Sequence, residues 1–489
     1  MRPLHLAVAL SIAMLGGCAT VSEVPTSSSG VDEAIVKLGK PSSDTDLLHF
    51  MEKGELLRRK GNEEEARETL LKADAVVRLW EDHARNPVGR VAETAGSLFL
   101  NDQVRTYEGR DYEKVLLSNR LTASHLAMGE WDKARTEVKK MHEREAIIAE
   151  FRAKDLEKAK AEAAEKGVKA TSFREIDGYP VETLDHPEVN ALKNSYESAY
   201  SNYIAGFVYE ALGEGGLAAA GYRKAIEMRP GEPLLAAALD GLDARISRGG
   251  VKAGMVDTLF MVEAGTAPQL QSVQLPLLLP IPSSTTGINI IATPISWPTV
   301  GPVRPTESPR FVNVNDTQNI NLALLTNLDI MIRKSIADEM PGIIARSSIR
   351  AITRGAAQQA IDDNSGQFGA FGSIISLVSK GAALALEQAD VRSWRNVPGE
   401  YSVGRAALPV GKHKISITDS VGNLHTQEVD LKGRYAVVLL NVNRNEIRLA
   451  SNGYGDNASI AEVKPQPVIA PEPLKGKKSK KVAKKSAQK

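Results

Sequence analysis

The feature that most restricts the fold is the spacing of small and aromatic residues between positions 199 and 232. Small side chains at such intervals let two antiparallel helices approach closely, and a proline ends the second helix. The pattern consists of Gly206, Tyr209, Gly213, Ala218, Tyr222, Ala225 and Pro230. The segment is therefore predicted to form a helical hairpin.

Two weaker copies of this pattern precede it. The first consists of Gly54, Gly61, Ala66 and Ala73, and the second has Gly129, Trp131 and Ala134, with Thr122 in place of its first small residue. Recurrence of such hairpins is typical of tetratricopeptide (TPR) repeats, which bury their apolar faces by stacking on one another. We expect a TPR-like helical repeat domain over residues 44–248, with a generic helical bundle as the alternative.

The apolar pattern changes from helical to alternating near residue 251, which indicates strands. Strands are expected at 256–262, 273–279, 288–291 and 311–314, and a meander of strands between 401 and 449. Helices are expected at 317–338, 341–362 and 368–388. The predicted fold class is α+β and multidomain, in which a mixed domain of antiparallel β-strands with inserted helices, residues 251–450, follows the TPR-like domain.

The N-terminus has the parts of a secretory signal over residues 1–17. An apolar run behind Arg2 ends in Leu15-Gly16-Gly17-Cys18, which contains the chain's single cysteine and resembles the lipobox of bacterial lipoproteins. We expect fatty acylation of Cys18, such as by palmitate, and a flexible tether over residues 18–43. Ala19 favours the outer membrane, and we expect the protein to lie at the periplasmic face of that membrane. The alternative is an ordinary signal peptide.

The C-terminal segment 451–489 is rich in Pro and Lys and is predicted to be disordered. Its end, Lys475–Lys489, holds eight lysines and no acidic residue, whereas the whole chain has a formal net charge of only +1. The body is therefore acidic, which argues against nucleic acid as a partner. The tail is interpreted as a solubilising end, or as a contact for lipopolysaccharide or another anionic cell-wall polymer.

Catalytic chemistry is not indicated. The eight histidines lack metal-ligand spacing, and no second cysteine is present to complete a site. His413 and His425 flank a predicted hairpin, but two ligands alone make a poor metal site. We therefore expect no catalytic residue, no metal and no cofactor.

Two groups of residues are candidates for recognition. The residues expected to line or shape a partner-binding groove of the TPR-like domain are Tyr112, His125, Trp131, Asn202, Tyr203 and Tyr209. The second group, Asp390, Arg392 and Trp394, shares one face of an extended segment by alternation. It is interpreted either as a recognition patch or as a structural corner between helix and sheet.

A resemblance joins these features. Three segments carry it together with the Cys18 motif: Tyr107–Lys114, Gln388–Trp394 and Leu408–His413. They resemble an uncharacterised family of proteobacterial outer-membrane lipoproteins with N-terminal TPR-like helices. The resemblance covers roughly residues 10–450 and implies location and architecture, with a loose association with regulators of cell-wall synthases.

The favoured hypothesis is a non-enzymatic scaffold or adaptor in envelope assembly or cell-wall regulation. It would hold an envelope protein or peptide in the TPR-like groove and contact the membrane through Cys18. The first alternative is a structural tether between the outer membrane and peptidoglycan or another anionic polymer, using the C-terminal domain and Lys475–Lys489. The second alternative is an envelope enzyme.

Overall fold

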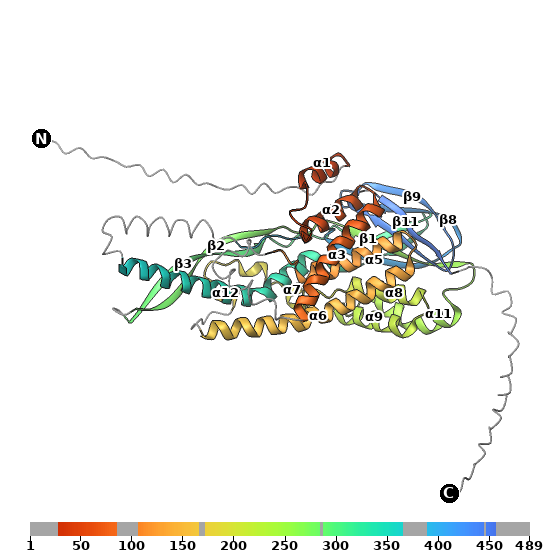
Figure 1. Ribbon diagram of the computed structural model, residues 1–489. Helices are drawn as coiled ribbons and strands as arrows, with labels where there is room; N and C mark the ends of the chain where they lie inside the picture. The colour runs from red at the N-terminus through yellow and green to blue at the C-terminus, as the bar shows by residue number, and fades with distance from the viewer. Residues whose placement is uncertain are drawn as a thin grey trace, which may run out of the picture.

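The computed structural model describes residues 28–85, 106–165, 172–283, 287–364, 389–444 and 446–455. Helices fill most of the first half of the chain and strands most of the second, so the fold is mixed α+β (Figure 1). The helices of the first half are α1 (Ser28–Leu38), α2 (Leu47–Arg59), α3 (Glu63–Arg85), α5 (Asp111–Ala127), α6 (Trp131–Glu165), α7 (Pro187–Ala191), α8 (Ala199–Ala211), α9 (Gly215–Met228), α10 (Pro233–Asp240) and α11 (Leu242–Arg248).

Three helical hairpins, α2–α3, α5–α6 and α8–α9, have turns of the same geometry. Gly61, Gly129 and Gly213 end the first helices with φ of 83°, 71° and 78°, which favours glycine. Each glycine N–H donates to the carbonyl three residues earlier, and the following N–H donates to the carbonyl five residues earlier. This is the Schellman arrangement. The three hairpins therefore reverse direction in the same way.

Close helix approach explains the small residues within these hairpins. A Cβ added at Gly54 would stand 2.5 Å from Leu70, and one at Gly206 would stand 2.6 Å from the Tyr222 ring. Ala66, Ala134 and Ala218, each five residues after the turn glycine, are fully buried.

The second half contributes one long helix and eleven strands within its described residues. The helix is α12 (Leu328–Asn364), and the strands are β1 (Met255–Ala264), β2 (Leu270–Ser283), β3 (Gly287–Val300), β4 (Phe311–Val314), β5 (Gln318–Asn321), β6 (Ala323–Asn327), β7 (Glu400–Pro409), β8 (Gly411–Thr418), β9 (Leu424–Leu431), β10 (Tyr435–Asn441) and β11 (Glu446–Tyr454). A five-stranded sheet has the order β11-β10-β1-β7-β6, and a four-stranded sheet the order β5-β4-β8-β9. The β2–β3 hairpin stands apart as a two-stranded sheet.

The five-stranded sheet is covered on both faces. On one face, Leu259, Val403 and Leu439 belong to a core shared with the helices. On the other, Phe260 and Val438 join the core beneath the four-stranded sheet. Burial on both sides accounts for the nearly continuous apolar runs of β1 and β10. Helices and strands thus share one core across the predicted boundary near residue 250, and the division into two domains stays a prediction.

The β2–β3 hairpin and α12 extend away from the rest of the fold (Figure 1). They lie together with the C-terminal part of α6, opposite the end of the molecule that carries β8 and β9. Tyr179 fixes the base of the hairpin, because its hydroxyl donates to the carbonyl of Pro298 at 2.7 Å.

Two predicted helices differ in the structure. Residues 317–338 were expected to be helical, but β5 and β6 occupy 318–327, because cross-strand pairing with β4 and β7 outweighs local preference. The helices expected at 317–338 and 341–362 are replaced by the single helix α12, which begins at Leu328 and continues through Pro341. Buried Ile336, Met340 and Ile344 hold both sides of the proline on one core.

Strand pairing and the tether also differ from expectation. The expected antiparallel meander is interrupted, since β10 pairs in parallel with β1, Asp257 opposite Tyr435. Within the segment expected to be a flexible tether, residues 28–38 form α1, in which Val31 is buried and Asp32 pairs with Lys60 at 2.7 Å.

Several predictions fall outside the described residues. They are the signal segment 1–17, Cys18, the helix expected at 368–388 and most of the tail 451–489. None of the helices in the described part of the chain is both long and apolar enough to span a membrane.

Candidate binding site

The candidate site is an open cavity of about 640 Å³ between α10, β5 and β7. Its size falls within the range of small-ligand sites, about 300–1,000 Å³. Small apolar side chains, including Ala237 and Ala406, line much of the wall, and the amides of Gln318, Asn319 and Asn321 line the strand side. The cavity thus combines apolar surface with neutral hydrogen-bonding groups.

Two arginines and Glu232 form the charged part of this wall, and the Glu232 carboxylate accepts from the Leu234 N–H at 3.3 Å. The guanidinium of Arg405 donates to Asp257 at 2.6 and 2.8 Å and to Glu210 at 2.7 Å. Arg245 donates to the same Glu210 carboxylate. Tyr222 connects them, since its hydroxyl accepts from Arg405 at 3.0 Å and donates to Glu210 at 2.7 Å. Two cations and two anions therefore neutralise each other beside the cavity.

The Glu210 carboxyl of this cluster stays ionised. Burial alone would raise the pKa of the Glu210 carboxyl, but the charge of Arg405 and hydrogen bonds from both arginines outweigh burial and lower that pKa. Burial raises the pKa of the Tyr222 hydroxyl well above its ordinary value. A phenol that holds its proton and a carboxylate bound to two guanidinium groups suit a structural ion cluster better than acid–base catalysis.

The remaining site residues offer no recognisable reactive set. The cavity lining holds no histidine or cysteine. Within the described residues, no group of three or more His, Cys, Asp or Glu side chains is placed to hold a metal ion. What the cavity can provide is shape, neutral hydrogen-bonding groups and apolar contact.

All six residues expected to line the TPR-like groove are buried. They have exposed fractions of 5% or less: Tyr112, His125, Trp131, Asn202, Tyr203 and Tyr209. Tyr203 alone of the six lines the cavity. Tyr112 donates to Glu113 at 3.1 Å, Asn202 to the Ser198 carbonyl at 3.0 Å, and His125 lies 2.7 Å from Glu130.

The surface on which they lie is covered by the chain's own five-stranded sheet. Aromatic pairs join helices to strands, with ring centroids 5.1 Å apart for Trp131 and Tyr454 and 5.0 Å apart for Tyr200 and Tyr401. Of the six side chains, Trp131 packs directly on the sheet, and a partner would reach it only after the helices and the sheet separate.

Asp390 and Arg392, which were expected to share one face with Trp394, form an ion pair. The Arg392 guanidinium donates to the Asp390 carboxylate at 2.7 and 2.9 Å and stacks over the ring of Tyr107, 5.1 Å from its centroid. Trp394 is fully buried, and its backbone N–H donates to Glu113 at 2.7 Å. The ion pair is partly exposed, whereas the indole belongs to the core.

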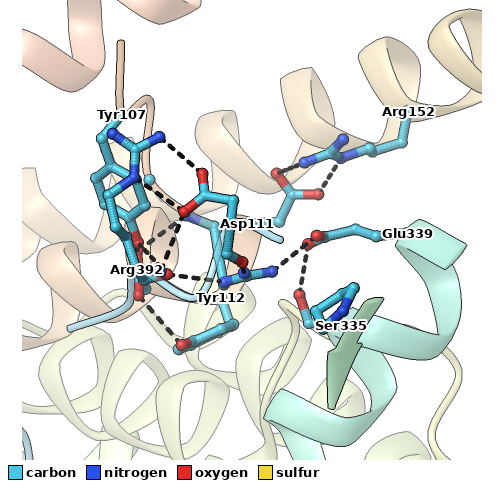
Figure 2. A network of polar contacts seen from close by, with 12 residues as sticks. Tyr107, Asp111, Tyr112, Arg152, Ser335, Glu339 and Arg392 are labelled. Carbon is cyan, nitrogen blue, oxygen red and sulfur yellow. Dashed lines mark hydrogen bonds and ion pairs between the residues drawn. The ribbon is translucent and has the colours of Figure 1, made fainter. Parts of the chain in front are cut away.

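Figure 2 shows that this segment belongs to a polar network linking α5, α6 and α12. The Arg110 side chain donates to Glu339 of α12 at 2.8 Å and to the Asp390 carbonyl at 2.9 Å. Arg152 of α6 pairs with Asp111. The network fastens segment 389–396 to the helices, as expected of a structural corner, and a recognition role stays a prediction.

The two histidines of the predicted hairpin do not meet. In the β8–β9 register, His413 stands opposite Val429, and His425 opposite Ile417. His413 contacts Asn315 and the Pro409 carbonyl, and His425 lies 3.0 Å from Asp419.

Sequence reasoning missed the cluster that borders the cavity. Its residues are Glu210, Arg245, Asp257 and Arg405. Asp257 and Arg405 interrupt apolar strand sequences, and a charge inside a buried strand usually has an opposite charge beside it. That signal was available, although their partners lie far away in the chain.

Comparison of the chain with models of protein families, with curated proteins and with solved structures finds no match.

Proposed function

We propose that the chain is a non-enzymatic, lipid-anchored adaptor of the bacterial envelope, which binds a partner in the cavity between α10, β5 and β7. Acylation of Cys18 would hold the protein at the periplasmic face of the outer membrane. Anchoring confines the cavity to a thin layer and raises its effective concentration for a partner in the same layer. The anchor proposal rests on the Leu15–Cys18 sequence.

The proposal treats the helical half as a TPR-like scaffold. Its support is the common turn at Gly61, Gly129 and Gly213 and the repeated close contacts of the helices. In an open TPR array the inner face binds a peptide, but here the five-stranded sheet covers that face. The binding function is therefore assigned to the cavity beside the sheet.

One observation carries the assignment to binding. The cavity is open and large, yet both arginines that border it have carboxylate partners, and the one other charged group, Glu232, accepts from the Leu234 N–H as the N-cap of α10. Such a wall offers hydrogen-bonding groups and apolar contact to a bound chain, and its one carboxylate without an arginine partner, Glu232, is engaged as a helix cap.

The anchor is tested by cell fractionation and intact mass. Wild-type protein should be recovered in the membrane fraction with acyl chains on residue 18, and Cys18→Ala protein should be free of them. A wild-type protein that is soluble, unacylated and begins elsewhere would refute the anchor.

The binding role is tested by a photo-crosslinking amino acid placed in the full-length protein in cells. Ala407 is exposed and lines the cavity, whereas Val421, 80% exposed, lies on the β8–β9 turn away from it. We expect a discrete envelope-protein adduct at position 407 and not at position 421. Equal labelling at both positions, or no adduct at 407, would contradict the proposal.

The tether remains a second candidate because of the eight lysines in Lys475–Lys489. It predicts that full-length protein sediments with purified cell-wall sacculi, and that deletion of 475–489 abolishes this sedimentation. Charge attraction of this kind should weaken steeply with salt.

A further inference from the structure

One edge of the five-stranded sheet is incompletely paired beside the cavity. Strand β7 pairs with β1 along its whole length, from Glu400 to Pro409. On its other side, β6 pairs with it only as far as Val403, opposite Ala323. Among the described strands, none continues this pairing beside Arg405 and Ala407. The chain before β6 instead turns away as β5 to pair with β4.

The register shows which backbone groups point toward this gap. The N–H of Val410 donates to the carbonyl of Gly254 in the β1 direction. Because hydrogen-bonding direction alternates along an antiparallel strand, residues 400–410 of even number face β1, and those of odd number face the opposite edge. The N–H of Asp257, which stands opposite Ala407, donates to the Arg434 carbonyl beside β10 and not to β7, which agrees with this phase. The N–H and C=O groups of Arg405 and Ala407 therefore face the open edge.

These groups lie at the cavity. Arg405, Ala406 and Ala407 form one wall, and β5 forms another. The two strands converge at Gly404, where an added Cβ would stand 3.2 Å from the Asn321 carbonyl oxygen. Beyond this point they diverge and leave a wedge. The wedge begins where the pairing of β6 with β7 ends, so it lies where the next segment of a paired strand would run.

The chemistry of the wedge selects its occupant. Arg405 and Arg245 are neutralised by Glu210 and Asp257, so the wall offers no uncompensated positive charge for an acidic ligand. The Glu232 carboxylate is engaged as the N-cap of α10. The alanines at 237, 238, 406 and 407 leave room for small side chains, and the amides of β5 favour neutral polar ones. An unpaired strand edge is a ready template for another extended chain.

We propose that the cavity binds an extended, uncharged peptide segment of a partner protein, which adds as a strand to the open edge of β7 at Arg405 and Ala407. This deepens the proposed function and rests on it. Main-chain hydrogen bonds to these two residues fix the peptide, and small side chains fill the wedge, as in other cases of strand addition.

The test uses the purified full-length protein and a fluorescent, end-blocked peptide of eight alternating threonine and alanine residues. Two matched peptides carry backbone N-methyl groups at alternate positions, in opposite phases. A peptide paired on one edge turns alternate N–H groups toward β7, so methylation in one phase should weaken binding about tenfold or more. Methylation in the other phase should change the peptide affinity by less than about twofold. Glu/Ala and Lys/Ala peptides should bind more weakly than Thr/Ala.

Protein variants give a second measurement. Ala407→Pro removes an N–H that faces away from β1, so the β1 ladder should persist while peptide affinity falls about tenfold. Ala407→Ser keeps the N–H and should retain affinity within about twofold. If the proline variant does not fold, the N-methyl peptides still test whether the peptide adds as a strand to β7.

Binding that is insensitive to the phase of methylation, or no binding of the Thr/Ala peptide by folded protein, would overturn strand addition. The cellular adduct at position 407 could still form in that case, which would leave the proposed adaptor function standing. Conversely, phase-dependent peptide binding without any cellular adduct would support the edge site and count against the adaptor.

Discussion

The guanidinium of Arg405 lies 2.6 Å from a carboxylate oxygen of Asp257, although the two residues are 148 positions apart. They are diagonal neighbours on the β1–β7 pair, since Asp257 stands opposite Ala407. Glu210 of α8 shares the same guanidinium. The contact therefore joins the sheet to the helices beside the cavity.

Replacing Arg405 should destabilise the whole fold. Arg405→Met leaves the buried carboxylates Asp257 and Glu210 without this guanidinium, which typically costs about 3–5 kcal/mol of unfolding free energy. Chemical denaturation at neutral pH measures the loss. Lys412→Ala removes an exposed pair with Glu428 and should cost less than about 1 kcal/mol. Equal effects of the two substitutions would contradict this assignment.

The same substitution should change the dependence of stability on pH. In the wild type the pKa of Glu210 is below its ordinary value, so its contribution is present at neutral pH and is lost as pH falls through that lowered pKa. Without Arg405, burial should disfavour the charged form. We expect the stability difference between wild type and Arg405→Met to be largest near pH 7 and to shrink on acidification. Denaturation midpoints from pH 7 to pH 3 measure this, and a constant difference would refute it.

The buried carboxyl of Glu145 should give folding stability a pH dependence of opposite sign. Burial raises the pKa of the Glu145 carboxyl to about 7, although Lys224, 2.7 Å away, opposes the shift. Its stabilising contribution is complete at low pH and is lost as pH rises from about 4.5 to about 7. Glu145→Gln should therefore gain up to about 3 kcal/mol relative to wild type over that interval.

The control for Glu145 is Glu143→Gln, an exposed position on the same helix. Burial and Lys224 lower the pKa of nearby His142, so His142 makes stability rise with pH. This effect is present in both wild type and Glu145→Gln and should cancel when their stability curves are compared. Parallel stability curves for wild type and Glu145→Gln would contradict the prediction.

Gly206 should tolerate no side chain. Gly206→Ala places a Cβ 2.6 Å from the buried ring of Tyr222 and should cost about 1–3 kcal/mol of unfolding free energy. The matched control is Gly216→Ala in the neighbouring helix, where an added Cβ meets nothing within 4 Å. It should stabilise by about 0.5–1 kcal/mol because alanine favours helix. Thermal unfolding measures both, and effects of the same sign would contradict the packing.

Glu113 should control the docking of segment 389–396. Its carboxylate accepts from the N–H of Trp394 at 2.7 Å and from the hydroxyls of Tyr107 and Tyr112. Glu113→Gln replaces one acceptor oxygen with a donor, which should cost about 1–3 kcal/mol and speed hydrogen exchange at the Trp394 amide. Glu150→Gln, an exposed site on α6, should leave that exchange unchanged. A Trp394 amide equally protected in both variants would argue against this role.

The hairpins were predictable because they depend on local spacing. The turn at Gly213 and the contact of Gly206 with Tyr222 follow from residues within one short segment. The strand segments of β1 and β7 were likewise visible as apolar runs. By contrast, the parallel pairing of β10 with β1 joins segments far apart in the chain, and alternation alone does not select a partner strand.

The groove prediction shows the limit of repeat analysis. Tyr209 and Trp131 were expected to line or shape a groove because they belong to the repeated pattern, but the pattern does not report what covers the helices. Here Trp131 packs against Tyr454 of β11, more than 300 residues later. The cavity could not be predicted from the sequence either, because its walls come from α10, β5 and β7 and form only when these elements pack together.

The most direct test of a binding cavity is the yield of the cellular adduct at position 407 when the cavity is filled. Ala237 is exposed on α10 and lines the cavity, so Ala237→Trp should occupy the space without entering the core. The account predicts at least a tenfold loss of adduct at position 407 with unchanged folding and unchanged membrane recovery. An undiminished adduct would show that the partner contacts residue 407 without entering the cavity, which contradicts the account.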